Sequence, residues 1–129
     1  MTMPPKKFGV IGYGNFGQLW AQILTRFGSV LVFDSKFSNE DVPEALSKIS
    51  FVSMVEVAQT DILFLAVPFK NFEKLCRELS LQLTPRTIVV DLCGVKVYPA
   101  KIMSAAFSKH QPYAGAHPLF GPKSVARTG

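Results

Sequence analysis

The sequence is poor in cysteine and in long apolar runs. Its only two cysteines, Cys76 and Cys93, lack a second pair or a histidine spacing suited to zinc, so we expect reduced thiols rather than a disulfide framework or a metal site. The longest apolar run, 62–67, ends at Pro68 and falls far short of the roughly 20 residues that cross a bilayer. No signal-peptide core forms near the N-terminus. We therefore expect a cytoplasmic protein without a membrane partner.

Acidic residues are absent after Asp91, so the excess positive charge of the chain lies in its last part. The chain carries 14 basic and 9 acidic residues, a formal net charge of +5. Basic and acidic residues balance up to Asp91, so the excess belongs to Lys96, Lys101, Lys109, Lys123 and Arg127. These cations are spaced singly among apolar residues, which disfavours nucleic acid as a partner. A small anionic molecule or an acidic partner fits better.

Apolar runs and amphipathic stretches alternate along the chain. Four runs typical of buried parallel strands lie at 8–11, 30–33, 62–67 and 87–92. Two apolar stripes at helical spacing predict helices at 16–27 and 72–79, and Pro99 marks the start of a third helix that runs to about residue 109. Gly28 would end the first helix, and the polar segment 35–47 predicts a loop with one helical turn after Pro43. The alternation predicts one α/β domain over residues 1–129, a Rossmann-type, doubly wound, mainly parallel sheet with helices on both faces.

The first apolar run leads into a glycine-rich turn, Gly12-Tyr13-Gly14-Asn15-Phe16-Gly17, which opens the first predicted helix. A helix N-terminus offers free N–H groups and partial positive charge to a pyrophosphate. Gly12 permits a tight turn, Gly14 leaves room for the pyrophosphate, and Gly17 lets the helix pack against the strand. Because a strand precedes the turn and a helix follows it, we expect these six residues to bind a dinucleotide.

An acid, Asp34, follows the second predicted strand. Its carboxylate can accept hydrogen bonds from both ribose hydroxyls, and its charge would repel the 2′-phosphate of NADP. The sequence therefore favours NAD and leaves NADP open, because Lys36 can steady a phosphate. The alternative role for Asp34 is to cap its own turn. We also expect Val67, Pro68 and Gly94, at the ends of later strands, to contact the cofactor.

Two further stretches lie where strand ends form the ligand crevice of an open sheet: Asp91-Leu92-Cys93-Gly94-Val95-Lys96 and His117-Pro118-Leu119-Phe120-Gly121-Pro122-Lys123-Ser124. With the glycine loop, they resemble the prephenate and arogenate dehydrogenases of tyrosine biosynthesis, over nearly the whole chain. The resemblance implies NAD(P)-dependent oxidative decarboxylation of a cyclohexadienyl acid, a small anionic substrate.

The same resemblance implies a catalytic role for His117, as the base that takes the substrate's hydroxyl proton. An imidazole, with an ordinary pKa of about 6.5, suits that task near neutral pH. His117 and Lys96 would both contact the substrate. The alternatives are a histidine that satisfies a loop hydrogen bond and a lysine on a solvated face.

The sequence departs from the family pattern at two points. Gly94 stands where the family usually has a serine, and losing one transition-state hydrogen bond costs on the order of 10²-fold in rate. The chain stops at Gly129, so we expect the family's C-terminal helical dimerisation domain, which completes the active site, to be absent. The sequence leaves open whether the chain is an enzyme or a non-catalytic NAD-binding or regulatory module derived from that family. The sequence also leaves open whether the chain forms a homodimer.

Overall fold

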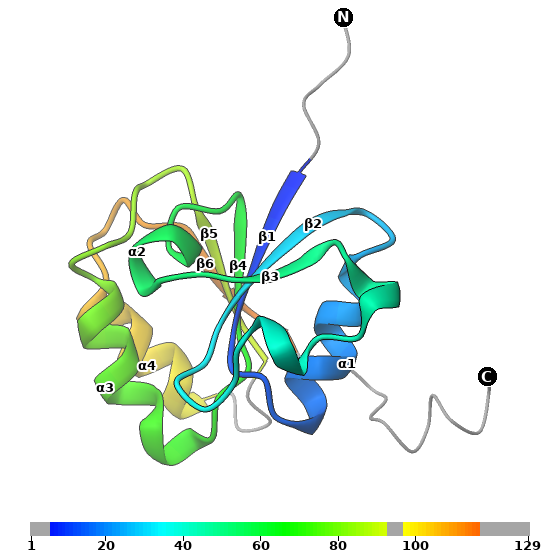
Figure 1. The fold of residues 1–129 in the computed structure, drawn as a ribbon. Coiled ribbons are helices and arrows are strands. Elements are labelled where there is room, and N and C mark those ends of the chain that lie inside the picture. The colour runs from blue at the N-terminus through cyan, green and yellow to red at the C-terminus, as the bar shows by residue number, and fades with distance from the viewer. Residues whose placement is uncertain (1–5, 93–96, 117–129) are drawn as a thin grey trace, which may run out of the picture.

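The computed structural model describes residues 6–92 and 97–116. Their six strands form one parallel sheet, in the order β3-β2-β1-β4-β5-β6. The strands are β1 (Lys6–Ile11), β2 (Gly28–Phe33), β3 (Ile49–Phe51), β4 (Ile62–Leu65), β5 (Ile88–Asp91) and β6 (Tyr113–Gly115). The helices are α1 (Asn15–Leu24), α2 (Met54–Val57), α3 (Phe69–Leu79) and α4 (Val97–Ala106), with two 3₁₀ turns, η1 (Asn39–Asp41) and η2 (Glu44–Leu46). Figure 1 shows α1 on one side of the sheet and α3 with α4 on the other, which confirms the doubly wound α/β class.

The strand order reverses next to β1. The chain runs outward from β1 to β3 and then crosses back to β4, on the other side of β1. The pairings of Ile11 with Phe33 and with Leu65, and of Leu65 with Asp91, bring the carboxyl ends of four strands level. In open α/β sheets this switch point is where ligands bind.

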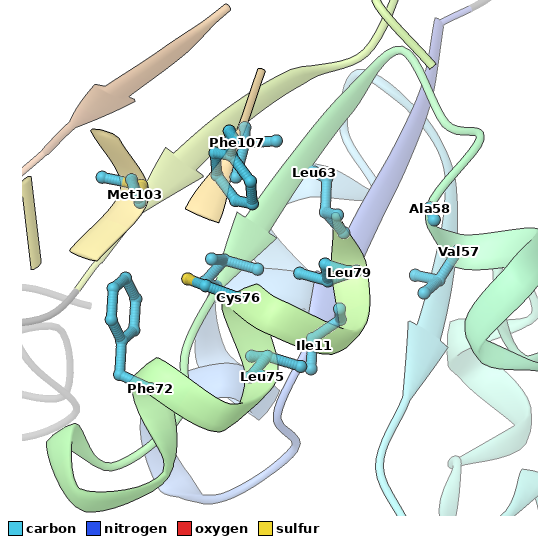
Figure 2. Packing of buried hydrophobic residues seen from close by; sticks show 12 residues of the cluster. Ile11, Val57, Ala58, Leu63, Phe72, Leu75, Cys76, Leu79, Met103 and Phe107 are labelled. Atoms are coloured by element: carbon cyan, nitrogen blue, oxygen red, sulfur yellow. The ribbon is translucent and has the colours of Figure 1, made fainter. Parts of the chain in front are cut away.

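Two apolar cores cover the two faces of the sheet. On one face α3 turns inward the side chains expected from its periodicity, Phe72, Leu75, Cys76 and Leu79. Figure 2 shows them among Ile11 and Leu63 of the sheet, Met103 of α4 and Phe107. On the other face α1 packs mainly through Ala21 and Leu24. The burial of Cys76 confirms the expected free thiol, while Cys93 lies outside the described residues.

The expectation for the end of the first helix was wrong. Helix α1 ends at Leu24, and Phe27 is 68% exposed rather than part of the buried stripe. Gly28 is the first residue of β2, not a helix stop. A Cβ atom there would lie 2.3 Å from the carbonyl oxygen of Lys6, so the close approach of β1 and β2 requires a glycine. The turn after Pro43 is confirmed by η2, whereas η1, β3, α2 and β6 were not expected.

Candidate functional site

A crevice of about 890 Å³ opens at the carboxyl ends of the strands. It gathers side chains and backbone from the glycine loop, the end of β2, the end of β4 and the outer face of α3. Most of the residues that the sequence nominated for the cofactor line it: Gly12, Gly14, Asn15, Phe16, Gly17, Asp34, Val67 and Pro68. Gly94, Lys96 and His117 lie outside the described residues, so the structure does not place them.

The three glycines of the loop have different surroundings, which explain why each position is a glycine. Gly12 has a φ of +106°, and a Cβ atom on it would lie 2.3 Å from the carbonyl oxygen of Ala66. A Cβ atom on Gly17 would lie 2.0 Å from the carbonyl oxygen of Gly12, because α1 starts directly against the loop. A Cβ atom on Gly14 would meet nothing within 4 Å. Two glycines therefore allow close packing, and the third leaves open space at the mouth of the crevice.

The N-terminus of α1 is arranged to receive an anion. Its N-cap residue is Gly14, which has no side chain to accept the first N–H groups, and the first turn contains no acidic residue. Backbone N–H groups at a helix start lack partners within the helix and carry partial positive charge. Beside the open space at Gly14, they fit a pyrophosphate group.

Asp34 joins the end of β2 to the glycine loop. Its Oδ2 atom accepts the N–H of Tyr13 at 2.7 Å, and its Oδ1 atom accepts the N–H of Lys36 at 2.9 Å. Asp34 therefore caps its own turn, which is the alternative role that the sequence left open. Each carboxylate oxygen can accept a further hydrogen bond. Because Asp34 also lines the crevice, capping and ribose binding are compatible.

Tyr13 does not line the crevice, although the sequence nominated it with the rest of the loop. Its side chain is only 3% exposed, and its ring packs edge-on against two others, with centroid distances of 5.5 Å to Phe37 and 5.0 Å to Phe51. The Nε2 atom of Gln18 donates to the Tyr13 carbonyl at 3.0 Å. Burial, and secondarily the negative charge of Asp41, raises the pKa of the Tyr13 hydroxyl.

Sequence reasoning missed one wall of the crevice. The exposed face of α3 contributes three polar side chains to it: Asn71, Lys74 and Glu78. Their spacing of three and four residues places them on one exposed helix face next to the apolar stripe, so the periodicity that predicted the buried face also indicated this exposed face. Met54 of α2 lines the crevice as well, and α2 was not predicted.

Asp91 is the last residue of β5 and is 1% exposed. Burial, and secondarily the charge of Asp91, raises the pKa of the Cys76 thiol to about 12. A thiol with this pKa stays protonated near neutral pH and is a poor nucleophile. Cys76 is therefore a core residue.

Two other classes of site are missing from the described part of the chain. Within residues 6–92 and 97–116, histidine, cysteine and carboxylate side chains form no group of three that could hold a metal ion. None of the helices in these ranges combines the length and hydropathy that a bilayer span requires.

Comparison with known proteins identifies the family. The chain is 26% identical over 126 residues to arogenate dehydrogenase 1, chloroplastic, of Arabidopsis thaliana, a match that covers 95% of this chain and 20% of that protein. The arogenate dehydrogenase structure from Synechocystis superposes with a TM-score of 0.75 at 26% identity, covering 89% of this chain and 41% of the other. The structure of prephenate dehydrogenase from A. aeolicus in complex with hydroxyphenyl propionate and NAD+ shares the fold, with a TM-score of 0.72, 22% identity and coverage of 92% and 43%.

The chain thus spans one fifth of that curated relative and about two fifths of those solved structures. The family model described as prephenate dehydrogenase, nucleotide-binding domain, matches residues 36–128. The glycine loop and Asp34 precede that match and are supported by their geometry and by the longer alignment to the Arabidopsis relative. The chain belongs to the prephenate dehydrogenase family and carries its nucleotide-binding domain.

Proposed function

We propose that the chain binds NAD in this crevice and forms the coenzyme half of a dehydrogenase that acts on prephenate or arogenate. The observation that carries the proposal is the pairing of an uncapped α1 N-terminus, open at Gly14, with a carboxylate at the end of β2. The residues present fit a dinucleotide, because one feature suits a pyrophosphate and the other a ribose. The A. aeolicus prephenate dehydrogenase, which shares the fold, forms a complex with the same coenzyme.

The chain's residues divide the coenzyme between them. Backbone N–H groups at the start of α1 bind the pyrophosphate, and Asp34 accepts hydrogen bonds from the adenosine ribose. The carboxylate disfavours a 2′-phosphate, so NAD is preferred to NADP. Val67, Pro68 and Leu92 provide the part of the crevice at the ends of β4 and β5, which we assign to the nicotinamide end. Bound there, NAD supplies a hydride acceptor.

We assign the substrate side to residues outside the described ranges. His117 takes the proton of the substrate hydroxyl, and Lys96 attracts the substrate's negative charge. Hydride leaves the ring carbon that carries the hydroxyl, carbon dioxide is lost, and the ring becomes aromatic. These roles are supported by family membership and by the His-Pro-x-x-Gly-Pro stretch at 117–122.

Turnover, in this proposal, depends on more polypeptide than the chain supplies. The match covers 20% of the Arabidopsis relative and 41% of the Synechocystis structure, and we infer that the remaining parts complete the substrate site and support a homodimer. We further propose that the chain is a single domain over 1–129 and acts in the tyrosine pathway in the cytoplasm. The name of the Arabidopsis relative places that protein in the chloroplast, so the compartment requires its own localisation experiment.

The second candidate function is a non-catalytic NAD-binding or regulatory module. It is favoured by Gly94, which provides no hydroxyl where the family usually has a serine. Such a module would keep Gly12, Gly14, Gly17 and Asp34 while losing turnover.

One experiment separates these functions. The purified chain is titrated with NAD and NADP by calorimetry and then assayed with prephenate and arogenate, as wild type and as His117→Asn. Turnover that requires His117 supports the dehydrogenase. NAD binding without turnover by either form shows that the chain alone is not an enzyme, which both functions allow. The chain is then fused to the remaining part of the Synechocystis arogenate dehydrogenase: turnover by the fusion supports the dehydrogenase, and its absence supports the non-catalytic module. Failure of both dinucleotides to bind at millimolar concentration refutes the coenzyme site itself.

A further inference from the structure

Tyr13 links the segments that build the two halves of the coenzyme site. Its backbone N–H reaches Asp34 at the end of β2, and its carbonyl is held by Gln18 of α1. Its ring packs against Phe37, in the loop after β2, and Phe51 of β3. The pyrophosphate loop and the ribose carboxylate therefore meet at one residue that does not line the crevice.

The backbone holds the loop on the Gly12 side, where the Gly12 N–H donates to the Phe33 carbonyl at 3.0 Å, whereas the Gly14 side faces open space. Tyr13 stands between Gly12 and Gly14, and glycine backbones lose the most conformational freedom when they are ordered. A Cβ atom on Gly14 would have no neighbour within 4 Å, so no side chain packs against that side of the loop. The Tyr13 side chain, 3% exposed, is the buried anchor of the Gly-Tyr-Gly turn.

The Tyr13 anchor also sets the direction of the Asp34 carboxylate. Tyr13 donates to Oδ2 and Lys36 donates to Oδ1, so the two N–H groups together fix the plane of the carboxylate. If the ring were lost, the Tyr13 N–H would move with the loop. The Oδ2 atom would then lose the donor that holds it at 2.7 Å.

From this geometry we propose, on the basis of the NAD site proposed above, that Tyr13 is a positioning residue. Its buried ring sets both the affinity for NAD and the discrimination against NADP, acting through the glycine loop and Asp34. Substrate contact is not involved. The aromatic ring, rather than the hydroxyl, carries this role because it is the ring that packs against Phe37 and Phe51.

The test compares three variants with the wild-type chain: Tyr13→Leu, Tyr13→Phe and the matched control Phe8→Leu. Phe8 is a buried aromatic residue of the same apolar core, within β1 and outside the glycine loop. Calorimetry gives the Kd for NAD and for NADP, and thermal melting gives the stability of each variant. The ratio of the two Kd values is the decisive quantity, because a uniform loss of folded protein does not change it.

We expect Tyr13→Leu to weaken NAD binding by about tenfold, the effect of freeing roughly one backbone residue, and to lower the NADP-to-NAD ratio of Kd values. Tyr13→Phe should keep both values, and Phe8→Leu should lower the melting temperature alone. If Tyr13→Leu does not fold, Phe51→Leu, which removes one ring contact behind the loop, replaces it with the same expectation. An unchanged ratio in the folded variant overturns the role of Tyr13, whereas a wild-type chain that binds neither dinucleotide overturns the NAD site.

Discussion

The substitution Gly14→Ala separates coenzyme binding from folding. Gly14 has φ −70° and ψ −168°, an extended conformation that any residue adopts, and its Cβ atom would meet nothing within 4 Å. The fold therefore accepts the methyl group. In the coenzyme site proposed above, the same methyl group would occupy the space through which the pyrophosphate reaches the N-terminus of α1.

The expected magnitudes follow from these two facts. An alanine restricts the unfolded chain and stabilises the fold by about 0.4–1 kcal/mol. It is a poorer N-cap than glycine by a comparable amount, so the free energy of unfolding stays within about 1 kcal/mol of wild type. A hydrogen bond to a charged group contributes about 1.5–3 kcal/mol. Losing one at the pyrophosphate raises the Kd for NAD by about 10- to 150-fold.

Calorimetric titration with NAD and a thermal melt of the same sample measure both quantities. We expect a melting temperature within about 4 °C of wild type together with the weakened Kd. Wild-type affinity in a folded Gly14→Ala protein would refute the placement of the pyrophosphate beside Gly14. A large drop in melting temperature would show instead that the space beside Gly14 is part of the packed loop.

Three further predictions concern residues with different surroundings. Gly17→Ala places a Cβ atom 2.0 Å from the Gly12 carbonyl oxygen, so we expect a loss of about 1–3 kcal/mol in urea unfolding, unlike Gly14→Ala. Asp34→Ala leaves the partly buried N–H of Tyr13 without its acceptor, which costs about 1–3 kcal/mol of stability. In parallel titrations, Asp34→Ala should also weaken the binding of NAD more than the binding of NADP. Equal weakening of the two affinities would contradict a contact between Asp34 and the ribose. The folded-state pKa of the Cys76 thiol is raised to about 12 from 9.0, so its contribution to stability is complete below pH 9 and is lost between pH 9 and 12. The free energy of unfolding is measured at several pH values for the wild type and for Cys76→Ala. Relative to the variant, the wild-type value should fall by up to about 1.4 kcal/mol per pH unit in that window. Parallel plots of the two free energies against pH would contradict the raised pKa.

Local signals predicted the elements that coincide with a long apolar run or with an apolar stripe at helical spacing. The apolar stripe 72–79 became the buried face of α3, because four side chains at helical spacing leave one orientation against a sheet. The short elements β3, α2 and β6 lie outside the predicted apolar runs and were missed, whereas β4 and β5, also short, lie within the runs 62–67 and 87–92 and were predicted. The strand β3 forms because its backbone pairs with that of β2, with Val30 opposite Ile49.

The end of α1 shows where a local signal misled. A glycine after an apolar stripe is typical of a helix stop, and Gly28 was interpreted in that way. The structure uses this glycine for close contact with Lys6, a residue 22 positions earlier in the chain. That contact depends on the pairing of β1 with β2, which no local pattern contains.

The sequence by itself determined the class of fold and the presence of a dinucleotide loop, because strand–glycine–helix spacing is a property of neighbouring residues. Only the tertiary structure decided how that loop is held. It placed Asp34, 21 residues away, on the N–H of Tyr13, turned the Tyr13 ring into the core, and brought α3 to the opposite wall of the crevice. These contacts join segments far apart in the chain, so they follow from the packing of the whole sheet and its helices.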